Sequence, residues 1–179
     1  MNRTSIVAVG ALVVAFFSVF TALYAVFAPK VDTPEARGAE ARARMAEHEQ
    51  RLLVHMTLFQ RYAEKSRLAA DADNWPLAAF YSEKIAQNAE WVVDGGYALD
   101  SLDISAIAAE VAVPRAERLA DAARSGDAAR FDSAYALMID GCNACHKRSG
   151  YRYVQIQTPT GDAPYPSQSF VPIPGLRPE

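Results

Sequence analysis

The sequence predicts an all-α protein: an antiparallel four-helix bundle with an N-terminal transmembrane helix and an irregular, proline-rich C-terminal tail. Three observations predict this fold class. Residues 5–28 include no charged side chain. Between residues 39 and 147, apolar residues recur at helical spacing, and no segment alternates convincingly as a half-buried strand would. Six of the 10 prolines lie in residues 151–179, where a regular helix is therefore not expected.

The uncharged segment is long enough to cross a bilayer. Its 24 residues would span about 36 Å as a helix, and the hydrocarbon core of a bilayer is about 30 Å thick. A cleaved signal peptide is the alternative, although its apolar region is usually only about 7–15 residues long. Cleavage after Ala28 would also leave Pro29 as the first residue. We therefore expect residues 1–29 to form a cytoplasmic stub and a transmembrane anchor.

Residues 30–150 are expected to form one helical domain, whose first two helices cover residues 39–70 and 75–93. Asn74 is a suitable N-cap for the second helix, and Pro76 is tolerated in its first turn. An Asp-Gly-Gly sequence should end this helix, because glycine favours helix C-termini.

The third and fourth helices are expected at residues 104–124 and 128–147. Pro114 should kink or split the third helix, because proline lacks the backbone N–H and clashes with the preceding turn. The short breaks between successive helices favour antiparallel neighbours. Met138 and four large aromatic residues are expected in the core: Trp75, Phe80, Trp91 and Phe131.

Composition and charge exclude several function classes. The net charge is −3 and there is no long basic run, so nucleic acid is not an expected partner. The chain has only two cysteines and three histidines, too few for a disulfide-rich or cysteine-rich zinc scaffold. No Ser-His-Asp set, glycine-rich phosphate loop or paired-carboxylate motif stands out, so we do not expect an enzyme.

One motif carries specific chemistry. Cys142-Asn143-Ala144-Cys145-His146 has the C-x-x-C-H pattern. Two thiols at this spacing can each bond to a vinyl group of one haem, and the adjacent imidazole can then bind the iron. The motif therefore predicts one covalent haem c, attached at Cys142 and Cys145 with His146 as an iron ligand.

Three other interpretations of the cysteine pair remain open. A plain disulfide would suit an oxidising compartment. A zinc site would need a second pair of ligands, which the neighbouring sequence lacks. A thioredoxin-like redox pair is expected to open a helix in a β-α-β unit, whereas this pair closes a predicted helix in an all-helical chain.

A helical bundle with this motif near the end of its last helix resembles the class II cytochromes c, the cytochrome c′ and c556 type, over about residues 39–148. The resemblance implies one haem within a four-helix bundle, with His146 as the proximal ligand. In that family, some members leave the sixth iron position open and bind small gases. Others fill it with a side chain of the first helix and carry electrons. The resemblance is also compatible with a homodimer.

The first predicted helix supplies the candidates for the sixth ligand. Apolar residues and two histidines recur along it in steps of three and four: Met45, His48, Leu52, His55, Phe59 and Tyr62. In an antiparallel arrangement, His146 should lie level with about residue 51. His55 is therefore the favoured distal ligand, with His48 and Met56 as alternates and an open position as the remaining option.

Haem attachment of this kind takes place outside the cytoplasm. We therefore expect a single-pass protein of the bacterial inner membrane whose haem domain faces the periplasm. With a filled sixth position it would transfer electrons between periplasmic or membrane redox partner proteins, alone or as a subunit of a membrane complex. The alternative is a five-coordinate haem protein that binds or senses a small gas.

The tail, residues 151–179, is expected either to be a solvated end, as is common for termini, or to fold back over the cofactor, and we favour the second. The reason is its content of apolar and aromatic residues, which is high for a free terminus: Tyr151, Tyr153, Val154, Ile156, Tyr165 and Phe170. Three cations follow the motif: Lys147, Arg148 and Arg152. They would either interact favourably with the helix C-terminus or pair with haem propionates or an acidic redox partner.

Overall fold

The computed structural model describes residues 33–160, 165, 167–172 and 174. The predicted anchor at residues 5–28 lies outside these residues. Within the described part of the chain, no helix is both long enough and apolar enough to span a bilayer.

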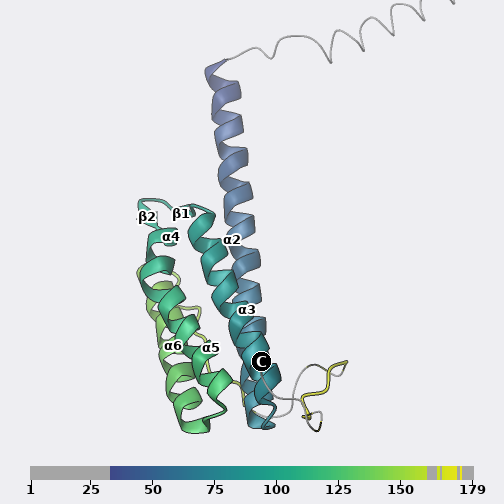
Figure 1. Ribbon diagram of the computed structural model, residues 1–179. Helices are drawn as coiled ribbons and strands as arrows, with labels where there is room; N and C mark the ends of the chain where they lie inside the picture. The colour runs from purple at the N-terminus through teal and green to yellow at the C-terminus, as the bar shows by residue number, and fades with distance from the viewer. Residues whose placement is uncertain (1–32, 161–164, 166, 173, 175–179) are drawn as a thin grey trace, which may run out of the picture. The chain divides into compact units, whose positions relative to one another are not determined.

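The described chain is built from helices, so the all-α class is confirmed (Figure 1). The long helices are α2 (Pro34–Asp71), α3 (Trp75–Asp94), α5 (Val113–Ser125) and α6 (Ala128–Arg148). A short helix and a π-helix lead into α5: α4 (Ile104–Ile107) and η1 (Ala108–Ala112). Before them, a small hairpin pairs β1 (Ala98–Leu99) with β2 (Leu102–Asp103).

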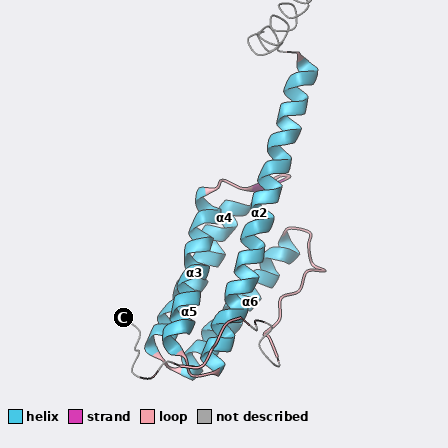
Figure 2. Cartoon of the chain, turned by 90° about the vertical axis from the view of Figure 1, so that its right-hand side faces the viewer, coloured by secondary structure: helices cyan, strands magenta, loops and turns pink. Residues whose placement is uncertain are grey.

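Two compact units divide the chain, Met1–Ala43 and Arg44–Glu179. In the first unit, Thr33 caps the start of α2, because its Oγ1 accepts a hydrogen bond from Ala36 N at 3.1 Å. In the second unit, α3, α5 and α6 lie alongside the part of α2 that belongs to the same unit (Figure 2). The site described below lies entirely within this second unit.

Local signals set the helix ends, and the predicted N-cap at Asn74 is confirmed. Asn74 caps α3, with its Oδ1 accepting from Leu77 N at 3.3 Å. Gly126 ends α5 with a φ of +65°, a backbone conformation that glycine adopts without strain. Asp127 then caps α6 by accepting from Arg130 N at 3.0 Å.

The predicted break at Pro114 is also confirmed. The helical stretch changes from α4 to the π-helix η1 and then to α5, with Pro114 in the first turn of α5. Proline has no N–H to offer Glu110, four residues earlier, so the regular bonding pattern cannot continue there. π-helical turns inside helices often mark functional sites, and η1 lies at the cavity described below.

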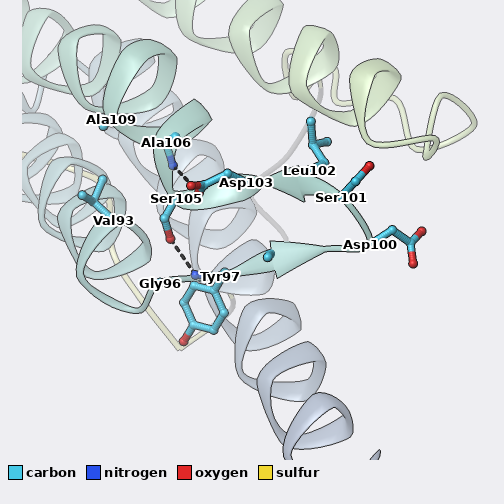
Figure 3. Close-up of a pocket in the computed structure, with 11 residues that line it drawn as sticks. Val93, Gly96, Tyr97, Asp100, Ser101, Leu102, Asp103, Ser105, Ala106 and Ala109 are labelled. Atoms are coloured by element: carbon cyan, nitrogen blue, oxygen red, sulfur yellow. Dashed lines mark hydrogen bonds between the residues drawn. The ribbon is translucent and has the colours of Figure 1, made fainter.

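The hairpin was not predicted, because two-residue strands are too short to produce a period-two pattern. Its position is fixed by Ser105, whose Oγ accepts from Tyr97 N at 2.7 Å and donates to Val92 O at 2.5 Å. Figure 3 shows the bond between Ser105 and Tyr97 and the nearby cap in which Ala106 N donates to Asp103 Oδ1. Tyr97 is buried as a result.

Small residues fill much of the core. Between α2 and α3, Ser66 Oγ lies 2.8 Å from Ser82 Oγ and donates to Ala78 O at 3.2 Å, so these helices approach closely. The larger core residues lie mainly on α3, α5 and α6: Ile85, Leu119, Phe131, Tyr135, Met138 and Ile139. The expected burial of Phe131 and Met138 is therefore confirmed.

Two of the four aromatic residues expected in the core lie at the surface instead. Phe80 is 49% exposed and Trp91 is 47% exposed. Phe80 and Trp91 are separated by 11 residues on α3, about three turns, so they lie on the same face of the helix. The opposite face of α3, rich in alanine, is the one that packs inward. Trp75 is partly buried against Phe131, with the two rings 5.8 Å apart.

Candidate cofactor site

The Cys142–His146 motif occupies the last turns of α6. Gly141, just before it, allows α6 to approach the preceding helical stretch closely. A Cβ atom at this position would lie 2.7 Å from Arg115 Cδ and 3.5 Å from Val111 Cγ1. A larger side chain here would force the Arg115 side chain to move.

Cys142, Cys145 and His146 all line one cavity of about 990 Å³. This volume is at the upper end of the range for small-molecule and cofactor sites. The walls come from α2, α3, α6, the helical stretch from α4 to α5, the segment around Tyr97 and the start of the tail. Much of the lining is apolar and includes Leu52, Phe59, Ile85, Ile107, Met138 and Ile139.

Both cysteines are free thiols. Burial, followed by the neighbouring Cys145, raises the pKa of the Cys142 thiol to about 11, so this group is protonated at neutral pH. Redox-active cysteine pairs and metal-binding thiolates have lowered pKa values instead. The environment of Cys142 therefore differs from that of an activated redox cysteine.

The His146 ring is oriented by the start of the tail. Its Nδ1 lies 3.1 Å from the backbone oxygen of Val154. A carbonyl oxygen only accepts hydrogen bonds, so Nδ1 carries the proton and donates it. The lone pair is then on Nε2, and an imidazole held in this way is the usual form of a metal-binding histidine.

The described residues of the tail fold back onto the second unit. Tyr151, Val154 and Ile156 line the cavity, while Tyr153 points to solvent with 75% exposure. Later in the tail, Phe170 is buried in the core, and Tyr165 packs beside it against the core. The tail thus forms part of the cavity wall through three of the six residues expected to cover the cofactor.

The α2 wall holds two of the three candidates for the sixth ligand. His48 and Met56 line the cavity. His55 is turned toward α3, where its Nδ1 lies 2.7 Å from Asn88 Oδ1 and its backbone oxygen accepts from Asn88 Nδ2 at 2.9 Å. His55 is not among the cavity-lining residues, although the Tyr97 ring contacts both histidine rings, at 5.7 Å for His48 and 5.6 Å for His55.

The predicted register between the first and last helices agrees with these contacts. Tyr135 Oη donates to Ala63 O at 3.2 Å, and Arg67 pairs with Asp132. His146 lies 11 residues beyond Tyr135 on α6, and stepping back 11 residues from Ala63 along antiparallel α2 reaches about residue 52. The sequence placed His146 level with about residue 51.

Sequence reasoning missed several polar residues of the site. Asn88 is fully buried and holds His55, but no pattern in α3 distinguishes it from an ordinary helix residue. Arg115 lines the cavity from α5 and donates to Val111 O at 3.0 Å. Asn143 lies within the motif itself, at a position that the C-x-x-C-H pattern leaves unspecified.

A second cavity, of about 430 Å³, adjoins the first at Gly96, Tyr97, Ala98 and Asp100, which line both. Its polar groups are largely used within the fold, since Ser105 and Asp103 both bond to backbone N–H groups (Figure 3).

Within the described residues, no group of three or more His, Cys, Asp or Glu side chains could hold a metal ion. No protein-family model matches the chain, and neither the curated proteins nor the solved structures gave a match.

Proposed function

We propose that this protein is a membrane-anchored monohaem c-type cytochrome that transfers electrons between periplasmic or membrane redox partners. One observation carries the proposal: the two thiols and the imidazole of the C-x-x-C-H motif line the same large, mostly apolar cavity. A haem needs such a cavity, because its porphyrin is apolar and its iron needs an axial nitrogen.

The residues present fit a haem. Cys142 and Cys145 would hold it through thioether bonds, and the Nε2 lone pair of His146 would bind the iron. When bound, the haem supplies a one-electron couple between ferric and ferrous iron. The chain's own contribution is to orient His146 through Val154 O and to exclude water with apolar side chains such as Phe59 and Met138.

A side chain of α2 would fill the sixth position. Met56 and His48 both line the cavity, and Met56 is the less exposed of the two. His55 does not line the cavity, so its Nε2 could serve only if the ring moved toward the cavity. Six-coordinate iron with two fixed axial ligands changes oxidation state without exchanging ligands, which suits electron transfer.

Residues 5–28 would anchor the protein in the bacterial inner membrane, with the haem domain in the periplasm. A tethered carrier exchanges electrons with proteins at the same membrane surface. Its partners would therefore be membrane or periplasmic redox proteins. The protein would meet them as a single chain, as a homodimer or as a subunit of a stable membrane complex.

A second function is favoured by one specific observation. His55, the sequence-favoured distal ligand, is bonded to Asn88, and the nearby cavity wall includes the apolar Leu52 and Phe59. If no α2 side chain reaches the iron, the haem would be five-coordinate and would bind or sense a small gas.

The first experiment expresses the full chain in a bacterium that attaches haem in its periplasm. Covalent haem is detected by haem staining after denaturing electrophoresis. The wild-type chain should stain, and the Cys142→Ser, Cys145→Ser double variant should not. Wild-type protein that folds but carries no covalent haem would refute the proposal.

Absorption spectra with and without carbon monoxide then separate the two functions. A low-spin reduced spectrum that carbon monoxide does not alter supports electron transfer. A high-spin spectrum that shifts with carbon monoxide supports gas binding instead.

A further inference from the structure

The start of the tail is held to the haem motif by one side chain. Asn143 Nδ2 donates to Ile156 O at 2.9 Å, and Asn143 Oδ1 accepts from Ile156 N at 2.7 Å. The amide of Asn143 thus bonds to both backbone groups of one residue, as a neighbouring strand would. We refer to residues 151–156 as the strap.

The strap is also fixed at its beginning. Tyr151 N donates to His146 O at 2.8 Å, and Val154 N donates to Tyr151 O at 2.8 Å. Between these bonds and the Asn143 bonds, the backbone of Val154 has little freedom. Its carbonyl oxygen is the atom that accepts from His146 Nδ1 at 3.1 Å.

We propose that Asn143 is a positioning residue for the proximal histidine. By locking the strap, it keeps the Val154 carbonyl on His146 Nδ1 and so sets the reduction potential of the iron. This inference rests on the proposed haem function. It assigns a role to a position of the C-x-x-C-H motif that the attachment chemistry leaves free.

The direction of the effect follows from the hydrogen bond. An imidazole whose Nδ1–H donates to an oxygen has more electron density on Nε2 and is a stronger donor to the iron. A stronger donor favours ferric over ferrous iron, because the ferric ion carries more positive charge. Loss of the bond should therefore raise the reduction potential.

The side chain at 143 is specific for this contact. An amide supplies one donor and one acceptor side by side, which matches the N–H and C=O of an extended residue. An aspartate lacks the donor, and an alanine lacks both. Ala144, the other free position of the motif, is exposed and makes no such bond among the described residues.

The test compares Asn143→Ala with Ala144→Asn in the full, haem-loaded chain. Both variants change a free position of the same pentapeptide, but only the first removes the bonds to Ile156. Asn143→Ala should retain covalent haem, show a more positive reduction potential, and exchange the Ile156 amide hydrogen about 30-fold faster, as expected for the loss of two ordinary hydrogen bonds. Ala144→Asn should match the wild type in all three measurements.

A second pair of variants leaves the motif untouched. Ile156→Pro removes the N–H that donates to Asn143, whereas Gln157→Pro places the same ring one residue further on, where the N–H makes none of these bonds. Ile156→Pro should raise the reduction potential in the same direction as Asn143→Ala, and Gln157→Pro should not.

The outcomes separate the inference from the proposed function. Absence of covalent haem from the wild-type chain overturns both. Covalent haem with the same reduction potential in wild type, Asn143→Ala and Ile156→Pro overturns the positioning role alone. A shift that Ala144→Asn shares also overturns it, because the effect would then belong to the motif's sequence and not to the strap.

Discussion

Two histidines of the second unit are each held at Nδ1 by an oxygen atom. His146 donates to the Val154 carbonyl, and His55 donates to Asn88 Oδ1. The Asn88 oxygen must be the acceptor, because its Nδ2 donates to His55 O. Both rings therefore keep a lone pair on Nε2, the form that can bind iron. They differ in surroundings, since only His146 lines the cavity.

The sequence predicted most of the α2 residues that face the cavity, but it did not predict that His55 faces α3. Met45, His48, Leu52 and Phe59 line the cavity, as the helical spacing indicated. Where the spacing predicted His55, the residue that lines the cavity is Met56, about 100° around the helix from His55. The contact that turns His55 away involves Asn88, 33 residues later in the chain. Local periodicity cannot encode such a distant partner.

The first prediction concerns the sixth ligand. Met56→Ala is expected to convert a low-spin reduced haem into one that binds carbon monoxide, because it removes the cavity-lining thioether. His55→Ala should leave the visible spectrum unchanged. Absorption spectra of the three single variants, with His48→Ala included, decide the question. A spectrum altered by His48→Ala or His55→Ala but not by Met56→Ala would identify a histidine as the ligand instead.

The buried Asn88 should contribute to the stability of the fold through its two contacts with His55. Asn88→Ala would leave the backbone oxygen and the Nδ1–H of His55 without their partner in a partly buried setting. We expect a loss of about 1–3 kcal/mol in the free energy of unfolding, measured by denaturant unfolding. Glu90→Ala, at an exposed position of the same helix, is the control. Equal stability of the two variants would show that water replaces Asn88 at no cost.

At the scale of elements, short-range signals decided what could be predicted. Asn74 and Pro114 act within a few residues of themselves, so the start of α3 and the break before α5 followed from the sequence. The exposed positions of Phe80 and Trp91 did not follow, because burial depends on which face of α3 meets its neighbours. The hairpin at β1 and β2 depends on Ser105, which bonds to Tyr97 from eight residues away.

The cap of α6 provides a prediction at this scale. Asp127→Ala removes the acceptor for Arg130 N and should cost about 1 kcal/mol of unfolding free energy. Because the cap lies 15 residues from Cys142, about four turns, the haem spectrum should stay unchanged. Thermal unfolding monitors the first effect, with exposed Asp140→Ala in mid-helix as the control. A spectral change in Asp127→Ala would mean that fraying of α6 spreads to the motif.

At the scale of the whole described chain, the tail has two separate attachments. Its first part, residues 151–156, forms cavity wall and orients His146. Its second part bonds to the far ends of α2 and α3: Gln168 joins Lys65 and Tyr81, and Asn74 Nδ2 donates to Phe170 O at 3.0 Å. Composition indicated that the tail would fold back. It could not identify these partners, which lie about 90 residues earlier or more.

Alkaline pH should release the second part of the tail first. Tyr165 Oη donates to Glu64 Oε2 at 2.5 Å, and burial together with this carboxylate raises the pKa of Tyr165 from 10.0 to about 12. Because the pKa of Tyr165 is higher in the folded state than in the unfolded state, its protonated hydroxyl stabilises the fold at pH values below 10. This stabilisation is lost as the pH rises toward 12. Protease cleavage of the tail should therefore accelerate between about pH 10 and pH 12.

Burial also raises the pKa of Tyr135, so the comparison must isolate Tyr165. The Tyr165→Phe variant does so: its tail should already be cleaved faster at neutral pH and should show a weaker pH dependence over this window. An identical pH profile in the two proteins would assign the alkaline transition to groups other than Tyr165 and would leave the Tyr165–Glu64 bond without a role in holding the tail.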